Sequence, residues 1–320
     1  MLKLFSLFGY GCTTSHYSES ILKAAIEHAV DRTDPWIRAV PGYKKKLRPA
    51  VIRALDHVEA LVDDLPQPII LDQGSFESDP KLQTYFISFD NIQNIIGNDI
   101  ILRNYLRERE DPLPTVYAMT VMDKQEKRIL GMELSGDSVM RDVPQVTVSF
   151  NAHHFIDPSE NQDQTRLHVK QRALDHLLVL ALRHISVVET DRATLKQYRT
   201  LLKSKHNLIR RCGLGFSTIP IDEHIEVADV EKSLDEIETG LTKLGGDDRV
   251  LEFHLDIVCD ILTHPEKHLW SRKEKLIVDR MFIKQSVITN DAPEITLDMI
   301  DDSAGAEVVV SLVSLLNVMS

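Results

Sequence analysis

A long helical repeat in the second half of the chain constrains the fold more than any other feature of the sequence. Apolar residues recur there at alternating steps of three and four, which is the spacing of a coiled-coil seam. Because Gly245, Gly246 and Asp248 interrupt the repeat, we expect a kinked or frayed turn within one helix of roughly 54 Å at 1.5 Å per residue. The members of the repeat are Val227, Val230, Leu234, Ile237, Leu241, Leu244, Leu251, Leu255, Val258 and Leu262.

The charges around this repeat predict which segment it packs against. A second apolar stripe precedes it, in a segment that lacks proline. Residues 192–211 are basic and contain no acidic residue, whereas residues 222–241 carry eight acidic residues and one lysine. Folding the chain back near Phe216 and Ser217 brings these opposite charges together and penalises other alignments. The sequence therefore predicts an antiparallel helical hairpin.

Strand patterns flank this hairpin on both sides. Two segments, Thr115–Met122 and Arg128–Leu134, are rich in β-branched and large apolar residues, and the polar residues 123–127 between them predict a turn. Residues 145–150 alternate between apolar and polar side chains, as a strand with one solvated face requires. Further strands are predicted at Lys275–Ile283, Glu294–Ile300 and Ala306–Leu316.

The remaining N-terminal part of the chain carries helical patterns. Ser18 is placed to cap a helix that starts at Glu19, and Pro49 marks the expected first turn of a second helix that Pro66 ends. The whole chain is thus predicted to be an α+β protein with an inserted antiparallel coiled-coil hairpin. Its expected parts are a mainly helical region at 1–110, a β body from 111–164 and 266–320, and the hairpin at 165–265.

Composition narrows the functional classes. The hydrophobic content of 43% and the charged content of 27% are typical of a folded chain, and the formal charge of −12 disfavours binding to nucleic acid. Three widely spaced cysteines without a Cys-x-x-Cys pair fit reduced thiols, so we expect a cytoplasmic protein. No segment approaches 18 apolar residues without a charge, which disfavours a membrane-spanning helix.

The tip of the predicted hairpin is the first candidate site. Leu214, Phe216, Ile219 and Ile221 lie between the two charged blocks. They can form an exposed apolar knob that docks on a protein partner. The alternative is that these side chains fold over the end of the hairpin and bury one another.

A compact basic run is the second candidate. Lys44, Lys45, Lys46 and Arg48 can meet an anionic surface, and the apolar residues 1–8 can lie in a membrane interface beside them. Peripheral membrane contact is therefore a hypothesis. The alternative is a solvated helix face and an N-terminus that packs into the protein.

The third candidate is a group of metal-ligand residue types. His153, His154, Asp157 and Glu160 follow the 145–150 strand, where we expect a loop, but they lack a recognised spacing such as His-Glu-x-x-His. No other catalytic or cofactor-binding signature is present. The sequence therefore favours a non-enzymatic interaction or scaffold protein, without a cofactor, that binds a protein partner or itself through the hairpin. The alternative is a metal-dependent enzyme that uses the His153 loop.

Overall fold

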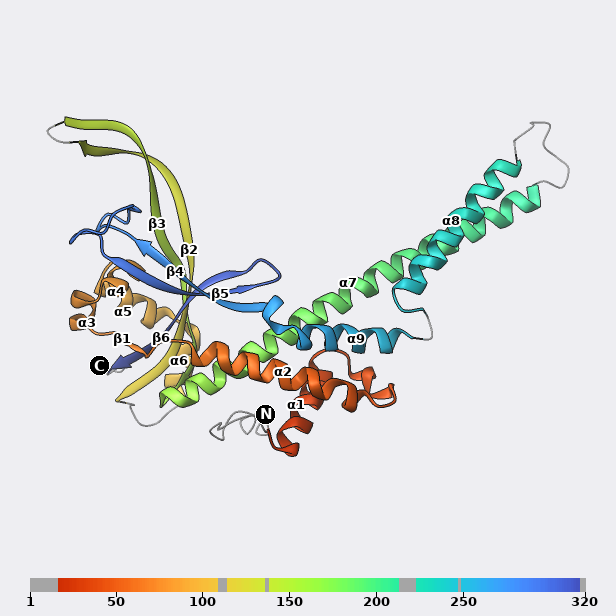
Figure 1. The fold of residues 1–320 in the computed structure, drawn as a ribbon, viewed down its shortest axis with the longest axis horizontal. Helices are drawn as coiled ribbons and strands as arrows, with labels where there is room; N and C mark the ends of the chain where they lie inside the picture. Colours follow the sequence, from red (N-terminus) through yellow and green to blue (C-terminus); the bar gives the residue numbers. More distant parts are fainter. Residues whose placement is uncertain (1–16, 109–113, 136–137, 213–222, 247–248, 317–320) are drawn as a thin grey trace. The chain divides into compact units, whose positions relative to one another are not determined.

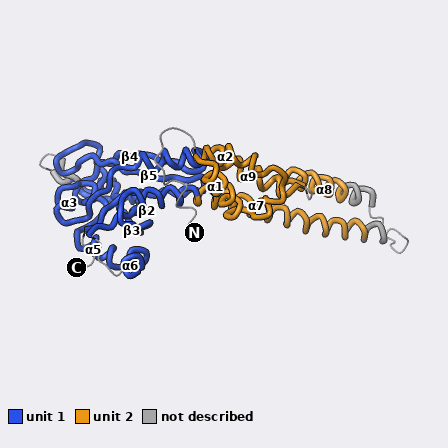
Figure 2. Tube along the Cα trace, turned by 90° about the horizontal axis from the view of Figure 1, so that it is seen from below, with its two compact units in different colours: residues 1–12, 55–174, 265–320 blue, residues 13–54, 175–264 orange. Residues whose placement is uncertain are grey.

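The computed structural model describes residues 17–108, 114–135, 138–212, 223–246 and 249–316. They form an α+β protein, as predicted (Figure 1). The chain divides into two compact units, which are described separately (Figure 2). Unit 1 comprises residues 1–12, 55–174 and 265–320, and unit 2 comprises residues 13–54 and 175–264.

Unit 1 is built on a six-stranded sheet whose strands come from both sides of the helical insertion. Five strands are antiparallel neighbours in the order β3-β2-β6-β5-β4, and the short β1 pairs in parallel with β6. The pairing of β2 with β6 joins the two strand sets that are distant in the sequence, as predicted. The strands are β1 (Ile69–Ile70), β2 (Thr115–Ser135), β3 (Ser138–Ser159), β4 (Leu269–Ile277), β5 (Glu294–Asp302) and β6 (Glu307–Leu316).

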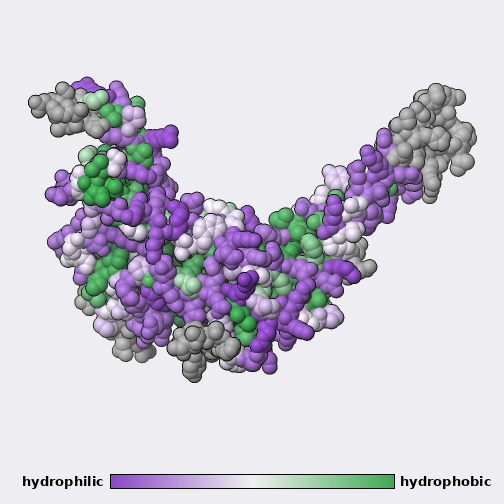
Figure 3. All heavy atoms as spheres, viewed as in Figure 1, coloured by the Kyte–Doolittle hydropathy of each residue, from purple (hydrophilic) through white to green (hydrophobic). Residues whose placement is uncertain are grey.

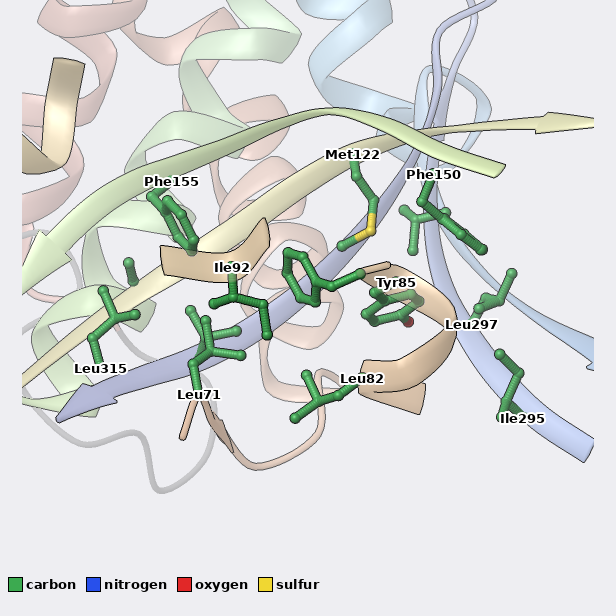
Figure 4. Close-up of a cluster of buried hydrophobic side chains, with 14 of the residues drawn as sticks. Leu71, Leu82, Tyr85, Ile92, Met122, Phe150, Phe155, Ile295, Leu297 and Leu315 are labelled. Carbon is green, nitrogen blue, oxygen red and sulfur yellow. The ribbon is translucent and has the colours of Figure 1, made fainter. Parts of the chain in front are cut away.

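The core of unit 1 lies between this sheet and four short helices. Strand β6 is buried continuously over residues 309–315, which explains its almost unbroken apolar sequence. Apolar side chains from the helices, such as Leu82 and Ile92, pack against strand residues such as Phe155 (Figure 4). Asp99 caps α6 and its second oxygen accepts from the backbone N–H of Phe155, 3.0 Å away. The helices are α3 (Gln73–Ser78), α4 (Pro80–Tyr85), α5 (Phe89–Asn98) and α6 (Ile100–Arg107).

The predicted turn at residues 123–127 is wrong, because β2 runs straight through this segment. Lys124 and Glu126 of this segment take part in ion pairs within the sheet. Glu126 lies 2.9 Å from the Nζ atoms of both Lys124 and Lys284, and Lys124 also pairs with Glu274 on β4. Glu274 and Lys284 come from distant parts of the sequence, so a local pattern could not reveal these pairs.

Strands β2 and β3 continue beyond the sheet as a two-stranded arm. The pairing of β2 with β6 ends at Met122, and residues 282–284 pair with β3 at residues 146–148, whereas the pairing of β2 with β3 continues to Ser135. Leu130, Met132 and Met140 are exposed on this arm, and hydrophobic residues are visible along it (Figure 3). Two-stranded ribbons of this kind are marginal in water, so the arm is a low-stability part of unit 1.

Unit 2 is helical, and two of its helices, α2 and α7, also contribute residues to unit 1. Ser18 caps α1 as predicted. Helix α2 begins at Tyr43, so the prediction that Pro49 lies in its first turn is wrong. The lysine and leucine residues before Pro49 are good helix formers and extend the helix upstream. The helices are α1 (Glu19–Arg32), the short η1 (Pro35–Ala39), α2 (Tyr43–Asp63), α7 (Gln162–Cys212), α8 (Glu223–Lys243) and α9 (Val250–Thr263); η2 (Pro265–Lys267) lies in unit 1.

The predicted single helix across residues 227–262 is also wrong, since α8 and α9 are separate. Gly245 has a φ of +87°, which is outside the helical range. A Cβ atom on Gly245 would lie 2.7 Å from the Cβ atom of Phe253, so the close approach of α9 depends on this glycine. The glycine pair therefore ends the helix and does not merely kink it.

A buried histidine joins three elements of unit 2. His254 on α9 is 5% exposed and lies between two carboxylates. Its Nδ1 atom is 2.8 Å from Asp34 Oδ2 at the start of η1, and its Nε2 atom is 3.0 Å from Glu189 Oε1 on α7. The contact with Asp34 has hydrogen-bond geometry, whereas the buried Nε2 atom has no hydrogen-bond partner among the described residues.

Candidate protein-interaction surface on the helical hairpin

Helices α7 and α8 lie side by side with opposite directions (Figure 1). Glu238 Oε1 is 3.3 Å from Arg199 Nη1, and Glu231 Oε1 is 3.3 Å from His206 Nε2. Both pairs are symmetric about residues 213–222, as the mirrored charge blocks predicted. Exposed pairs of this kind contribute only about 0.2–1 kcal/mol each, so they specify the alignment more than they stabilise it.

Apolar packing and one buried arginine hold the seam between the two helices. Val230 and Leu241 of α8 are buried, and a Cβ atom on Gly240 would approach Leu195 Cδ1 to 3.3 Å. Arg192 is 2% exposed, and its Nη1 atom donates to the carbonyls of Leu244, Gly245 and Gly246 at 2.9, 3.2 and 3.4 Å. These carbonyls end α8 and have no partner within the helix.

On one side of the hairpin, which we name the ionic flank, charged side chains of α7 and α8 pair with each other. It comprises Lys203 of α7 with Glu231 and Glu238 of α8. At about 100° per residue, Lys203 lies roughly a quarter turn from the seam residue Leu195. The ion pairs place the corresponding flanks of α7 and α8 on the same side of the hairpin.

The opposite side, which we name the open flank, exposes large apolar side chains. Residues 187, 191, 194, 198 and 201 of α7 follow one another at steps of four and three, so they form one stripe about a quarter turn from the seam. Within it Val187, Tyr198 and Leu201 are 55%, 57% and 65% exposed. Among the described residues of α8, no large hydrophobic side chain is exposed to this degree. Helix α7 therefore keeps an apolar stripe that α8 does not cover.

The open flank also carries unpaired acidic groups. Asp229, Ser233, Glu236 and Gly240 of α8 follow one another at steps of four and three on the side away from Glu231 and Glu238. Asp191 lies within the α7 stripe. Asp191, Asp229 and Glu236 are exposed and have no ion-pair partner among the described residues. Lys232 and Lys243 are exposed on the same side of α8, so the open flank is apolar with a border of mixed charge.

The predicted tip site lies outside the described residues. Leu214, Phe216, Ile219 and Ile221 all fall within residues 213–222. Their role in partner binding stays a prediction.

The predicted basic run begins α2, and carboxylates of unit 2 neutralise most of it. Lys44 pairs with Glu27 at 2.8 Å, Lys46 pairs with Asp256, and Arg48 pairs with Glu19. Only Lys45 in this run has no ion pair among the described residues. The Lys44 ammonium, with the Tyr43 hydroxyl and the Arg38 guanidinium, lowers the pKa of Glu27 to about 2. This pairing leaves little free positive charge for an anionic surface.

The expected metal-binding loop is wrong as a structure, because His153 and His154 lie within β3. Successive residues of a strand point to opposite faces, so the two imidazoles diverge. His153 Nε2 is 2.9 Å from the Tyr85 carbonyl oxygen and its ring stacks on Phe86, and burial lowers its pKa. Asp157, which has a φ of +54°, pairs with Arg172 through both oxygens at 2.7 and 2.8 Å.

The described ranges contain no other candidate metal site either. Within them, no group of three or more His, Cys, Asp or Glu side chains is arranged to hold a metal ion. Glu160, the last member of the predicted metal group, is exposed at the end of β3. Cys259 is half-buried in α9 as a free thiol, and burial raises its pKa to about 11, so this group is a poor nucleophile.

Comparisons of the chain with protein-family models, with curated proteins and with solved structures each found no match. None of the helices that the structure describes combines the length and the apolar character of a membrane span.

Sequence reasoning located the hairpin but missed the open flank. Val187, Tyr198 and Leu201 belong to a helix whose apolar residues occupy several faces, and the sequence does not show which face α8 covers. The spacing of four and three from Val187 to Leu201 was the available signal. It becomes informative only once the ion pairs show where α8 lies.

Proposed function

We propose that this chain is a non-enzymatic interaction protein that binds a protein partner through the α7/α8 hairpin. The observation that carries the proposal is the apolar stripe of the open flank. Val187, Tyr198 and Leu201 stay more than half exposed on a helix that is already fixed to α8 on another side. Aromatic and aliphatic side chains at such positions are the usual anchors of protein interfaces.

The size of this stripe limits what it can contribute. Full burial of a large apolar side chain stabilises by roughly 1.5–3 kcal/mol, and these three are already partly buried, so a partner would gain roughly 2–5 kcal/mol from them. This is less than micromolar binding requires, which is about 8 kcal/mol. The partner must therefore also use polar contacts along the same flank.

Membrane attachment and metal chemistry are not part of the proposal. Most side chains of the basic run form ion pairs within unit 2. The Nε2 atom of His153 lies at hydrogen-bond distance from the carbonyl oxygen of Tyr85. The hairpin instead supplies an exposed apolar surface on a helix that packs against α8. That combination suits recognition of another protein.

The experiment compares capture of partners by three forms of the full chain. We expect Tyr198→Ser with Leu201→Ser to lose proteins that the unaltered chain captures from a cell extract of its source. Ile87→Ser with Ile100→Ser is the matched control, because these side chains are 79% and 71% exposed in unit 1. Each captured protein is then purified and its binding is measured again with all three forms.

Two further measurements make the result decisive. Circular dichroism shows whether each variant keeps its helical content, and light scattering shows whether the chain associates with itself. Equal binding of a purified partner by the hairpin variant and by the control, with both folded, would remove the hairpin from the proposed function.

A further inference from the structure

We infer that the partner of the hairpin is a second copy of this chain, which binds with opposite direction along the outer side of α7. The inference rests on the proposed function and names its partner. It is carried by a stripe of exposed α7 residues, the outer stripe, whose residue types follow nearly the same order in both directions from Thr190. The outer stripe comprises Val179, Arg183, Ser186, Thr190, Thr194, Gln197 and Leu201.

The outer stripe lies on the side of α7 opposite to its buried residues. Ala181, Ile185 and Arg192 are buried and lie within about 40° of one another around the helix, so they mark its inner side. Thr190 follows Ala181 by nine residues, which is a rotation of about 180° at 100° per residue. In Figure 2 helices α8 and α9 lie along the same side of α7. Neither of these helices therefore covers the outer stripe.

The order of residues in the outer stripe suits a two-fold arrangement. The steps between its members are four, three, four, four, three and four, so the series is the same from either end. Two antiparallel copies centred on Thr190 place Val179 of each level with Leu201 of the other, and Ser186 level with Thr194. A two-fold interface requires such reciprocal contacts, and these pairs join apolar to apolar and hydroxyl to hydroxyl.

The hydroxyl groups at the centre of the outer stripe lose little when they are buried. Those of Ser186, Thr190 and Thr194 donate to carbonyl oxygens four residues earlier, at 2.9, 2.8 and 2.9 Å. Because each donor is satisfied within α7, a neighbouring helix leaves none of them without a partner. These side chains are also small, so two helix axes can approach closely there.

Two-fold symmetry also increases the apolar area that can be buried. Val187 and Tyr198 lie along one edge of the outer stripe, and they and Leu201 are buried in both copies, so each contributes twice. Val179 and Leu182, which are 56% and 39% exposed, extend the apolar area at the other end. A single helix pair is still smaller than a standard interface of about 1,200–2,000 Å², so we expect a weak dimer with a Kd on the order of 100 µM.

Charge favours a second copy over a strongly acidic or basic partner. Arg183 is the only charged residue of the outer stripe, although 27% of the chain is charged. A highly charged partner, including a phosphate backbone, would find little to pair with. Asp191 and Glu189 lie about 100° to either side of Thr190, so they stay at the solvated edges of the contact.

The same arginine favours the antiparallel direction. Parallel copies in register would bring the two Arg183 side chains together, which is unfavourable. Antiparallel copies instead place each Arg183 near Gln197 and Tyr198 of the other copy, where the guanidinium can stack on the ring. Opposed helix dipoles add to this preference.

The test measures the mass of the full chain by sedimentation equilibrium from about 5 to 300 µM, at about 0.15 M salt to screen its net charge of −12. We expect a reversible equilibrium between monomer and dimer. Thr190→Lys and Thr190→Glu should each raise the Kd about tenfold, because the two-fold axis brings the introduced charges together. An equimolar mixture of these variants should return the Kd to within about threefold of the unaltered chain, because opposite charges then meet.

Thr242→Lys is the matched control. Thr242 is also an exposed helical threonine, and its hydroxyl donates to the carbonyl of Glu238 at 2.8 Å, but it lies on α8 beside the ionic flank. We expect this variant to change the Kd less than about twofold. Circular dichroism checks that every variant keeps its helical content.

A second pair of substitutions tests the direction of the two copies. Val179→Lys and Leu201→Glu should each weaken the dimer, and their equimolar mixture should bind more tightly than either variant alone. The lysine introduced at position 179 of one copy then lies beside the glutamate introduced at position 201 of the other. In parallel copies these positions are roughly 33 Å apart along α7, so the mixture would restore nothing.

Any of three results would overturn the inference: a monomer at every concentration, equal effects of Thr190→Lys and Thr242→Lys, or no recovery in either mixture. The capture experiment separates this outcome from failure of the proposed function. If the chain is monomeric but a purified partner loses affinity with Tyr198→Ser and Leu201→Ser, the proposed function stands and the second copy is wrong. If the chain is monomeric and no purified partner loses affinity, both are wrong.

Discussion

Replacing Arg192 with methionine should loosen the end of α8 while leaving the rest of the hairpin assembled. The guanidinium is buried and makes one short hydrogen bond, to the Leu244 carbonyl at 2.9 Å, and two longer ones. Methionine keeps most of the side-chain volume but removes the donors and the charge. The carbonyls at the end of α8 would then lose their cationic partner.

The magnitude follows from the contacts. A hydrogen bond to a charged group contributes about 1.5–3 kcal/mol, and a cation at a helix C-terminus adds about 0.3–1 kcal/mol. Counting the 2.9 Å bond fully and the longer ones as weak, we expect a loss of about 3 kcal/mol. This corresponds to roughly 100-fold more frequent local opening, since 1.4 kcal/mol is tenfold.

Hydrogen exchange measured by mass spectrometry reports this local opening directly. In the Arg192→Met protein, peptides that cover α8 and Leu244–Gly246 should exchange roughly 100-fold faster, provided that global unfolding is rarer than this opening. Arg199→Met is the control, because its 3.3 Å pair with Glu238 is partly exposed and should change exchange less than about threefold. A change of less than threefold in Arg192→Met would refute the capping role.

Three other substitutions test the fold. Arg166→Met should lower the thermal midpoint measured by circular dichroism, with a loss of about 3 kcal/mol, because its guanidinium donates to three carbonyls at the end of α2 at 2.7–3.0 Å; an unchanged midpoint would contradict this. Gly245→Ala should lower the free energy of unfolding in urea by more than about 2 kcal/mol, because Gly245 has a φ of +87° and its Cβ position lies against Phe253. Gly246→Ala should lower it less, because Gly246 has a φ of +22° and nothing lies within 4 Å of its Cβ position. Equal losses in the two variants would contradict this. Glu27 has a folded pKa of about 2, below its usual 4.5, so its contribution to stability is present above about pH 4.5 and is lost as the pH falls through 2. Glu27→Gln should therefore reduce the loss of stability at acid pH, measured as unfolding free energy against pH. An unchanged dependence on pH would contradict the pairing.

Sequence patterns predicted those parts of the fold that depend on repeated spacing or on a few neighbouring residues. The mirrored charges on either side of residues 213–222 fixed how α7 and α8 align, because opposite blocks attract only in that arrangement. Ser18 capped α1, and the alternation in Glu294–Ile300 gave β5, since caps and strand alternation depend on a few neighbouring residues.

Other features depended on partners from distant segments. From the sequence Glu126 is predicted in a turn, but in the structure it pairs with Lys284. His153 is predicted as a metal ligand in a loop, but its ring lies beside the carbonyl oxygen of Tyr85. Gly245 is predicted as a kinked or frayed point of one helix, but Phe253 occupies the space that a side chain at this position would need. In each case a local pattern was compatible with two structures, and a contact across the fold selected one.

The candidate interaction surface combines both kinds of information. The sequence by itself determined that α7 and α8 pair with opposite directions, because the charge blocks and the heptad spacing are properties of the chain. Only the tertiary structure decided that Val187, Tyr198 and Leu201 stay exposed and that Glu236 lacks an ion-pair partner among the described residues. An apolar periodicity shows which side chains gain from burial, but which of them are buried is decided by where the neighbouring helix lies.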